Sequence, residues 1–230
     1  MKKADVGEFY RRLADRTPEP KTELEYVNDY TLLVAVVLSA QATDAGVNIA
    51  TRPLFRDVTT PQAMVALGEE RLREAIKTIG LFNTKAKNVI ALSRVLVDRY
   101  GGEVPADRDL LVELPGVGRK TANVVMNSAF GAETFAVDTH IFRVSNRTGL
   151  APGKNVLEVE LKLDRVTPSP YRLDAHHLLI LHGRYVCKAR KPECWRCIVA
   201  DLCRYQPKTP PPGSEPAVRA KARRKVAPPG

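Results

Sequence analysis

The chain has 230 residues, of which 44% are hydrophobic and 27% charged, and its formal net charge is +10 at neutral pH. This composition is ordinary for a soluble globular protein, and because no apolar run approaches the roughly 20 residues of a membrane-spanning helix, it excludes a membrane protein. The first residues, Met1-Lys2-Lys3-Ala4-Asp5, lack the apolar core of a signal peptide, so we expect a cytoplasmic protein.

Helical spacing of apolar residues recurs along the chain, whereas strand-like alternation does not, which predicts an all-α fold. Side chains that cap helices and glycines that end them indicate the boundaries. The expected helices cover 30–43, 83–100, 107–115, 119–130, 138–148, 156–166 and 171–186. Their expected N-caps include Asp29, Asn83, Asp107 and Asp138.

The excess positive charge is concentrated at the C-terminal end. Residues 1–183 contain 24 Lys and Arg against 23 Asp and Glu, residues 184–206 contain 6 against 2, and residues 207–230 contain 6 against 1. Clustered basic residues favour a polyanionic partner, because each neutralised phosphate releases counterions. A solubilising segment would have the same charge, so both interpretations stay open on charge alone.

A turn with two glycines, Gly116 and Gly118, joins two expected helices within 114–122. Glycine permits a positive φ and a close backbone approach. The free N–H groups at the start of the second helix can bind a phosphate. An ordinary interhelical turn would use the same residues, but the basic pair Arg119-Lys120 directly after it favours phosphate binding.

Two side chains near this turn have alternative interpretations. Lys120 is either a solvated cation or an amine nucleophile, which must be neutral to attack carbon. Asp138, in Val137-Asp138-Thr139-His140, either only caps the helix that follows or also moves protons at the mouth of a cleft. Composition alone leaves these alternatives open.

The four cysteines fall within residues 187–203, and are Cys187, Cys194, Cys197 and Cys203. Such clustering in a cytoplasmic protein predicts a metal centre rather than disulfides. The spacing C-x6-C-x2-C-x5-C matches neither the bacterial ferredoxin run nor the common paired zinc motifs, so zinc and an iron–sulfur cluster both remain open. His176, His177 and His182 lie outside the loop and are expected to pack rather than to bind metal.

Together these segments resemble the endonuclease III family of helix–hairpin–helix DNA glycosylases. The resemblance extends from about Tyr30 to Tyr205 and is carried by residues 38–44, 77–81, 114–125, 137–144, 151–156, 182–185 and the four cysteines. A pattern of this length is far more specific than any single motif.

The resemblance implies two helical lobes that flank a DNA-binding cleft. One lobe, residues 23–133, would be a six-helix bundle that contains the helix–hairpin–helix motif. The other would combine residues 1–22 with 134–206 and end in a C-terminal iron–sulfur cluster loop. Residues 207–230, rich in Pro, Ala, Lys and Arg, predict a disordered basic tail that adds nonspecific DNA affinity.

The resemblance also implies a bifunctional DNA glycosylase and AP lyase of base excision repair. Its partner would be double-stranded DNA that contains oxidised pyrimidines or abasic sites. Lys120 would attack C1′ of an everted nucleotide and form a Schiff base, Asp138 would assist in proton transfer, and β-elimination would cut the strand 3′ to the site. The four cysteines would bind a 4Fe–4S cluster. We expect a monomer associated with the bacterial nucleoid.

The remaining implied site residues contact DNA. Gln41 and Leu81 would fill or wedge the gap left in the duplex. The others are Gly116, Gly118, Arg119, Thr121, His140, Arg184 and Lys191. One alternative is an adenine glycosylase, against which Lys120 argues. The other is a noncatalytic, redox-responsive DNA-binding protein, which would leave Lys120 and Asp138 without a role.

Overall fold

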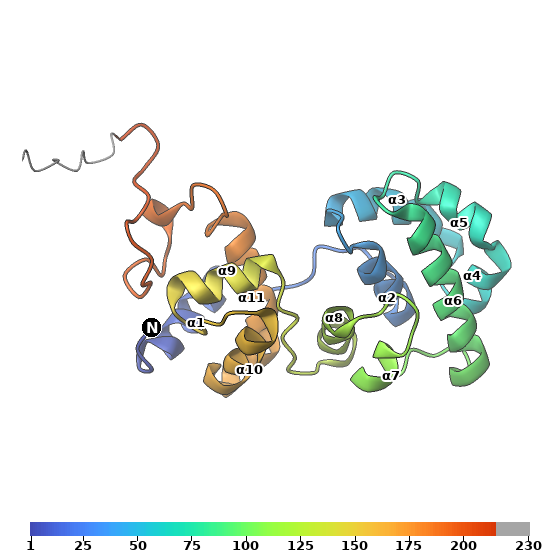
Figure 1. Ribbon diagram of the computed structural model, residues 1–230, viewed down its shortest axis with the longest axis horizontal. Helices are drawn as coiled ribbons and strands as arrows, with labels where there is room; N and C mark the ends of the chain where they lie inside the picture. The colour runs from blue at the N-terminus through green and yellow to red at the C-terminus, as the bar shows by residue number, and fades with distance from the viewer. Residues whose placement is uncertain (215–230) are drawn as a thin grey trace, which may run out of the picture.

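The computed structural model describes residues 1–214, and over these residues the chain is all-α, without a β-strand. The helices are α1 (Asp5–Arg16), α2 (Asp29–Leu38), α3 (Asp44–Asp57), α4 (Pro61–Leu67), α5 (Glu69–Ala75), α6 (Phe82–Tyr100), α7 (Arg108–Val112), α8 (Arg119–Phe130), α9 (Thr139–Thr148), α10 (Val156–Val166) and α11 (Arg172–Tyr185), with short 3-10 helices at Ser169–Tyr171 and Cys194–Arg196. They form two lobes side by side (Figure 1). In this part of the chain no helix is long and apolar enough to cross a membrane.

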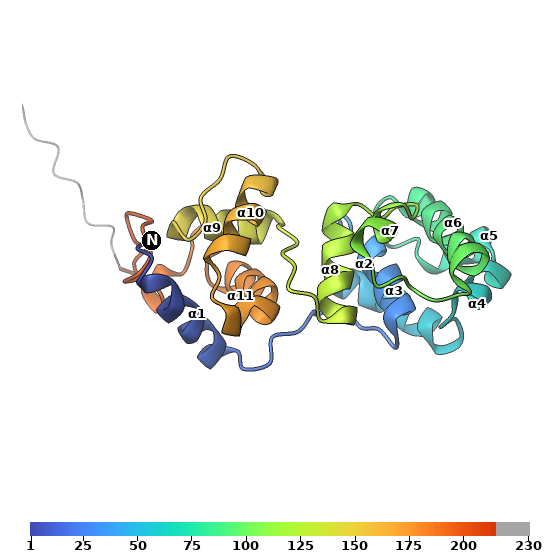
Figure 2. The same ribbon diagram turned by 90° about the horizontal axis from the view of Figure 1, so that it is seen from below.

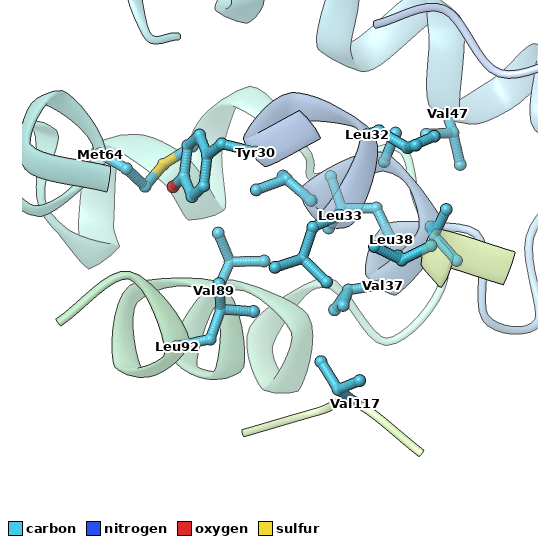
Figure 3. Close-up of a cluster of buried hydrophobic side chains, with 14 of the residues drawn as sticks. Tyr30, Leu32, Leu33, Val37, Leu38, Val47, Met64, Val89, Leu92 and Val117 are labelled. Atoms are coloured by element: carbon cyan, nitrogen blue, oxygen red, sulfur yellow. The ribbon is translucent and has the colours of Figure 1, made fainter. Parts of the chain in front are cut away.

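The first lobe is built around α2. Every residue from Tyr30 to Leu38 is buried, and α3, α6 and α8 pack around the helix. Figure 3 shows Leu33 and Val37 among side chains of the neighbouring elements, including Val89 and Val117. Full burial of one such side chain stabilises the fold by roughly 1.5–3 kcal/mol. The position of α2 is therefore well defined, and so is the start of the loop that follows it.

The predicted helix over 30–43 is shorter in the structure. It ends at Leu38, and Gln41 in the loop beyond has a positive φ of 56°, which a helix does not accommodate. Its N-cap is Asn28 instead of Asp29, because Asn28 forms a reciprocal capping box with Thr31. The prediction of Asp29 as the cap is wrong by one residue.

Residues 29–130 contain seven helices, α2 to α8, where the resemblance implies six between 23 and 133. Between α4 and α5 the chain turns at Gly68, which has a φ of 82° and divides one helical stretch into two short helices. The start of α6 also differs from the prediction. Its N-cap is Leu81, in the left-handed region at φ 61°, rather than Asn83.

The second lobe combines both ends of the described chain. Phe9 and Tyr10 of α1 are fully buried against residues of α9, α10 and α11, and Figure 2 shows α1 beside α11. The bounds of α9 and α10 agree with the prediction, with Asp138 as the N-cap of α9. Helices α9 and α11 approach closely at Gly183, where a Cβ would come within 2.9 Å of the His140 Cβ.

The predicted tail begins next to the second lobe. Lys208 donates hydrogen bonds to the carbonyl oxygens of Cys203 and Tyr205 at 2.8 and 2.7 Å. Residues 207–214 form no helix or strand. The rest of the predicted tail, 215–230, lies outside the described residues.

Candidate functional site

Lys120 and Asp138 line the same pocket, although the sequence places them on different lobes. Lys120 is the second residue of α8 and Asp138 caps α9. The pocket is lined by Lys21, Thr22, Glu23, Leu24, Val36, Ser39, Asp44, Lys120, Val124, Asp138, His176, His177, Ile180, Leu181 and Arg184. It therefore lies between the lobes, with walls from α2, α8, α11 and the segment that joins α1 to α2.

The turn before Lys120 depends on Gly116 and leaves the start of α8 without a side-chain cap. Gly116 has a φ of 80°, and a Cβ there would meet the Cβ and Nδ2 atoms of Asn88, both at 2.9 Å. Gly118 has a φ of −93°, with open space where a Cβ would lie, so of these two glycines it is Gly116 that uses the positive φ that glycine permits. No side chain of the described residues caps α8, which leaves its first N–H groups free for an anion.

Asp138 uses one carboxylate oxygen to begin α9. Its Oδ1 accepts hydrogen bonds from the backbone N–H groups of His140 and Ile141, both at 2.8 Å. Across residues 1–214, Oδ2 accepts no hydrogen bond from the protein. The cap thus fixes the orientation of the carboxylate and leaves one oxygen available to the pocket.

Arg119, the neighbour of Lys120, is paired across the lobes. Its Nη2 lies 2.6 Å from Glu160 Oε1 on α10, and Nε contacts the same carboxylate. Thr121, one residue beyond Lys120, is half-buried. The predicted DNA-contacting guanidinium is thus already partly neutralised by a carboxylate of the second lobe.

A carboxylate that the sequence interpretation gave no role also lines the pocket. Burial raises the pKa of Asp44, an effect that Lys120 opposes and the Asp138 carboxylate reinforces. Arg184 of α11 donates to Asp44 Oδ2 at 2.8 Å and is also paired with Glu23. Asp44 lies in segment 38–44, one of the segments that resemble the endonuclease III family, and that resemblance could have indicated Asp44 as a site residue.

His176 is fully enclosed in the pocket wall. Its Nδ1 accepts a hydrogen bond from the Ala136 N–H at 3.3 Å, which places the ring proton on Nε2. Burial, His177 and Lys120 together hold the pKa of His176 well below 6.5, so the ring is neutral. The packing role expected for this histidine is consistent with its burial.

Gln41 and Leu81 come from neighbouring loops. Both have positive φ angles and both are exposed, Leu81 by 58% of its surface. A Cβ at Gly80 would lie 3.9 Å from the carbonyl oxygen of Gln41, so the two loops are in contact. The structure thus brings together the two residues expected to enter the duplex.

Two other predicted DNA contacts lie away from this pocket wall. His140 is half-buried, with its Nδ1 3.1 Å from Nη2 of Arg143. Lys191 is exposed in the cysteine loop at φ 50°. Neither residue lines the pocket of Lys120 and Asp138.

The four cysteines line a pocket of their own in the second lobe, together with Arg147 and His182. Within the described residues, no three His, Cys, Asp or Glu side chains are close enough to hold one metal ion. Four cysteine thiolates are the donor set of an iron–sulfur cluster, and all four cysteines line this one pocket. Burial raises the pKa of Cys197 to about 11, so its thiolate requires a metal partner at neutral pH.

The chain matches two family models. Residues 34–169 match the HhH-GPD superfamily base excision DNA repair protein, and residues 187–203 match the iron-sulfur binding domain of endonuclease III. Endonuclease III of Escherichia coli (strain K12) is 57% identical over 208 residues, which are 90% of this chain and 99% of that protein. The Haemophilus influenzae protein of the same name is 56% identical over 208 residues, with the same coverage of 90% and 99%.

Solved structures agree with these matches. A trapped endonuclease III–DNA covalent intermediate has a TM-score of 0.83 at 46% identity and covers 89% of this chain and 96% of that one. A thermostable thymine-DNA glycosylase has a TM-score of 0.77 at 25% identity, with coverage of 88% and 95%. The all-α fold and the iron–sulfur cluster predicted from the sequence are confirmed. Shared identity over nearly the whole length, and not the fold alone, shows that the chain belongs to the endonuclease III family, as a DNA glycosylase and AP lyase of base excision repair that holds an iron–sulfur cluster.

Proposed function

We propose that this enzyme excises oxidised pyrimidines from double-stranded DNA with Lys120 as the nucleophile, and then cuts the strand 3′ to the site by β-elimination. One observation carries the proposal: Lys120 and Asp138 line one pocket between the lobes. An amine and a carboxylate at one cavity can attack a sugar carbon and move the released proton. The relative described as a covalent intermediate with DNA supports the same chemistry.

The reaction begins with eversion of the damaged nucleotide, which costs a few kcal/mol and least for a poorly stacked base. The Nζ lone pair of Lys120 bonds to C1′, and the bond from C1′ to the base breaks, with its electron pair leaving on the base. Asp138 takes a proton from the Lys120 nitrogen through its free oxygen. The nitrogen lone pair then forms a double bond to C1′ while the C1′–O4′ bond breaks. The electron pair of that bond goes to O4′, which takes the proton from Asp138, and a protonated Schiff base results.

Strand cleavage follows from the Schiff base. Loss of a C2′ proton moves an electron pair toward the iminium, and the bond from C3′ to the 3′-phosphate oxygen breaks. The strand is therefore cut 3′ to the site. Water hydrolyses the remaining Schiff base and returns the free amine of Lys120.

The DNA contacts follow from the exposed elements around the pocket. Gln41 and Leu81 occupy the gap left in the duplex, and the free N–H groups at the start of α8 bind a backbone phosphate. Lys191 and Arg184 add contacts from the second lobe. Because Lys120 and Asp138 belong to one chain, a monomer suffices, and its substrate places it on chromosomal DNA.

Borohydride trapping tests the proposal. The wild-type protein should form a covalent complex with DNA that contains an abasic site or thymine glycol, because borohydride reduces the Schiff base to a stable amine. Lys120→Ala should lose that complex, whereas Lys162→Ala, which removes an exposed lysine of α10, should retain it. A hydrolytic adenine glycosylase or a noncatalytic DNA-binding protein would give no trapped complex with the wild type, and either outcome would refute the proposal.

A further inference from the structure

We propose that His182 and Arg147 donate N–H hydrogen bonds to cysteine sulfurs of the iron–sulfur cluster and raise its reduction potential. His182 Nε2 lies 3.7 Å from Cys197 Sγ, and Arg147 Nη1 lies 3.8 Å from Cys187 Sγ. Both nitrogens belong to side chains that line the cysteine pocket. Neither contact involves the pocket of Lys120 and Asp138.

His182 is held in place by its burial near the end of α11. Only 7% of its surface is exposed, and within residues 1–214 Cys197 is the hydrogen-bond partner of its Nε2. A cysteine sulfur that binds iron has no proton to give. The hydrogen bond must therefore run from the imidazole N–H to the sulfur, which fixes the proton of His182 on Nε2.

Arg147 is fixed by contacts on three sides. It donates from Nη1 to the Lys188 carbonyl oxygen at 2.6 Å and from Nη2 to the Ala189 carbonyl oxygen at 2.8 Å. Its Cζ lies 5.0 Å from the centre of the Tyr205 ring. These contacts leave the guanidinium little freedom to move away from Cys187, and the group remains a cation at any ordinary pH.

Hydrogen bonds to ligand sulfurs are among the factors that set the potential of an iron–sulfur cluster. Reduction adds negative charge to the cluster and its sulfurs, so a nearby N–H stabilises the reduced form more than the oxidised form. In the described part of the chain, Cys194 and Cys203 accept no side-chain hydrogen bond of this kind. The two donors therefore act on one sulfur each, Cys197 and Cys187.

Voltammetry of the full-length, cluster-loaded protein tests this role. His182→Leu should shift the midpoint potential to more negative values, by roughly a tenfold change in the redox equilibrium, or about 59 mV for one electron. His182→Gln should recover most of the shift, because its amide nitrogen can take the place of Nε2. Iron content and visible absorbance, measured on each sample, establish that the same cluster is compared.

Arg147→Met should shift the potential in the same direction. Its matched control is Arg12→Met, because Arg12 also binds a carbonyl of the cysteine loop, Ile198 O at 2.9 Å, but contacts no sulfur. An unchanged potential in His182→Leu, or an equal shift in Arg12→Met, would overturn the inference. If His182→Leu does not retain iron, the variants His182→Gln and His182→Asn are compared instead. The shorter Asn side chain should not reach the sulfur, so its potential should be more negative than that of the Gln variant. Equal potentials of these two variants would refute the sulfur contact.

Discussion

Replacement of Asp138 should separate the helix cap that its carboxylate forms from the proton transfer that we propose for it. Its Oδ1 caps α9 through two backbone N–H groups at 2.8 Å, and the proposed proton transfer uses Oδ2. Asp138→Asn keeps an oxygen that can accept both N–H groups but removes the negative charge. Asp138→Ala removes both functions.

The two variants should differ in stability and agree in activity. Loss of a capping oxygen costs about 0.5–2 kcal/mol, and because Oδ1 accepts two short hydrogen bonds, we expect the upper part of that range for Asp138→Ala. For a chain of this size this corresponds to a fall in Tm of roughly 3–8 °C. Asp138→Asn should remain within about 0.5 kcal/mol of the wild type, because Asn and Asp cap equally well. Both variants should lose about 10²- to 10⁴-fold in the excision step.

Urea unfolding followed by circular dichroism measures the first effect, and single-turnover base excision at saturating enzyme measures the second. Excision by Asp138→Asn at the wild-type rate would show that the carboxylate moves no proton. Equal stability of the Ala and Asn variants would show that the cap contributes nothing measurable. The first result would refute the proposed proton transfer, and the second would refute the expected contribution of the cap to stability.

Three other changes have defined outcomes. Leu81→Gly should raise the free energy of unfolding by up to about 1 kcal/mol, because Leu81 has a φ of 61°, which glycine adopts without strain. The same variant should bind duplex DNA with an abasic site more weakly. Leu81→Ala should also weaken binding, but without the gain in stability. Gly116→Ala should cost about 1–3 kcal/mol in urea unfolding, because φ is 80° and the new Cβ would meet Asn88 at 2.9 Å; a variant as stable as the wild type would contradict the close approach. Burial holds the pKa of His176 well below 6.5, so below that pH the unfolded chain binds a proton at this residue that the folded chain does not. This one histidine should make stability fall by about 1.4 kcal/mol per pH unit below pH 6.5, in addition to the effects of His177 and His182, and His176→Leu should reduce the measured slope by that amount.

The sequence predicted those helices that have strong local boundary signals. Helix α8 ends at Gly131, which has a φ of 64°, and α9 lies between the Asp138 cap and Gly149 at φ 74°, so both were located correctly. Helices α3, α4 and α5 were not predicted. The buried residues Val47, Ala50 and Leu54 of α3 do follow helical spacing, but Pro53 lies inside the helix and interrupts the pattern. Helices α4 and α5 have seven residues each, which is too short for an apolar period to stand out.

The site was predicted in its residue types but not in its pairings. Lys120 and Asp138 were singled out from local features, whereas their meeting in one pocket depends on how the two lobes pack. The ion pairs of Arg184 with Asp44 and Glu23 join residues that are more than a hundred positions apart. No local pattern carries information about such contacts, because they depend on tertiary packing.

The position of α1 has a consequence for the synthesis of the protein. Phe9 and Tyr10 leave the ribosome early, but the apolar residues that cover them begin at Phe135 and continue to Val199. The intervening helices of the first lobe can already pack on one another while α1 remains uncovered. The cysteine loop is among the last described parts to be translated, so iron–sulfur insertion and the burial of α1 must both wait until almost the whole polypeptide has emerged.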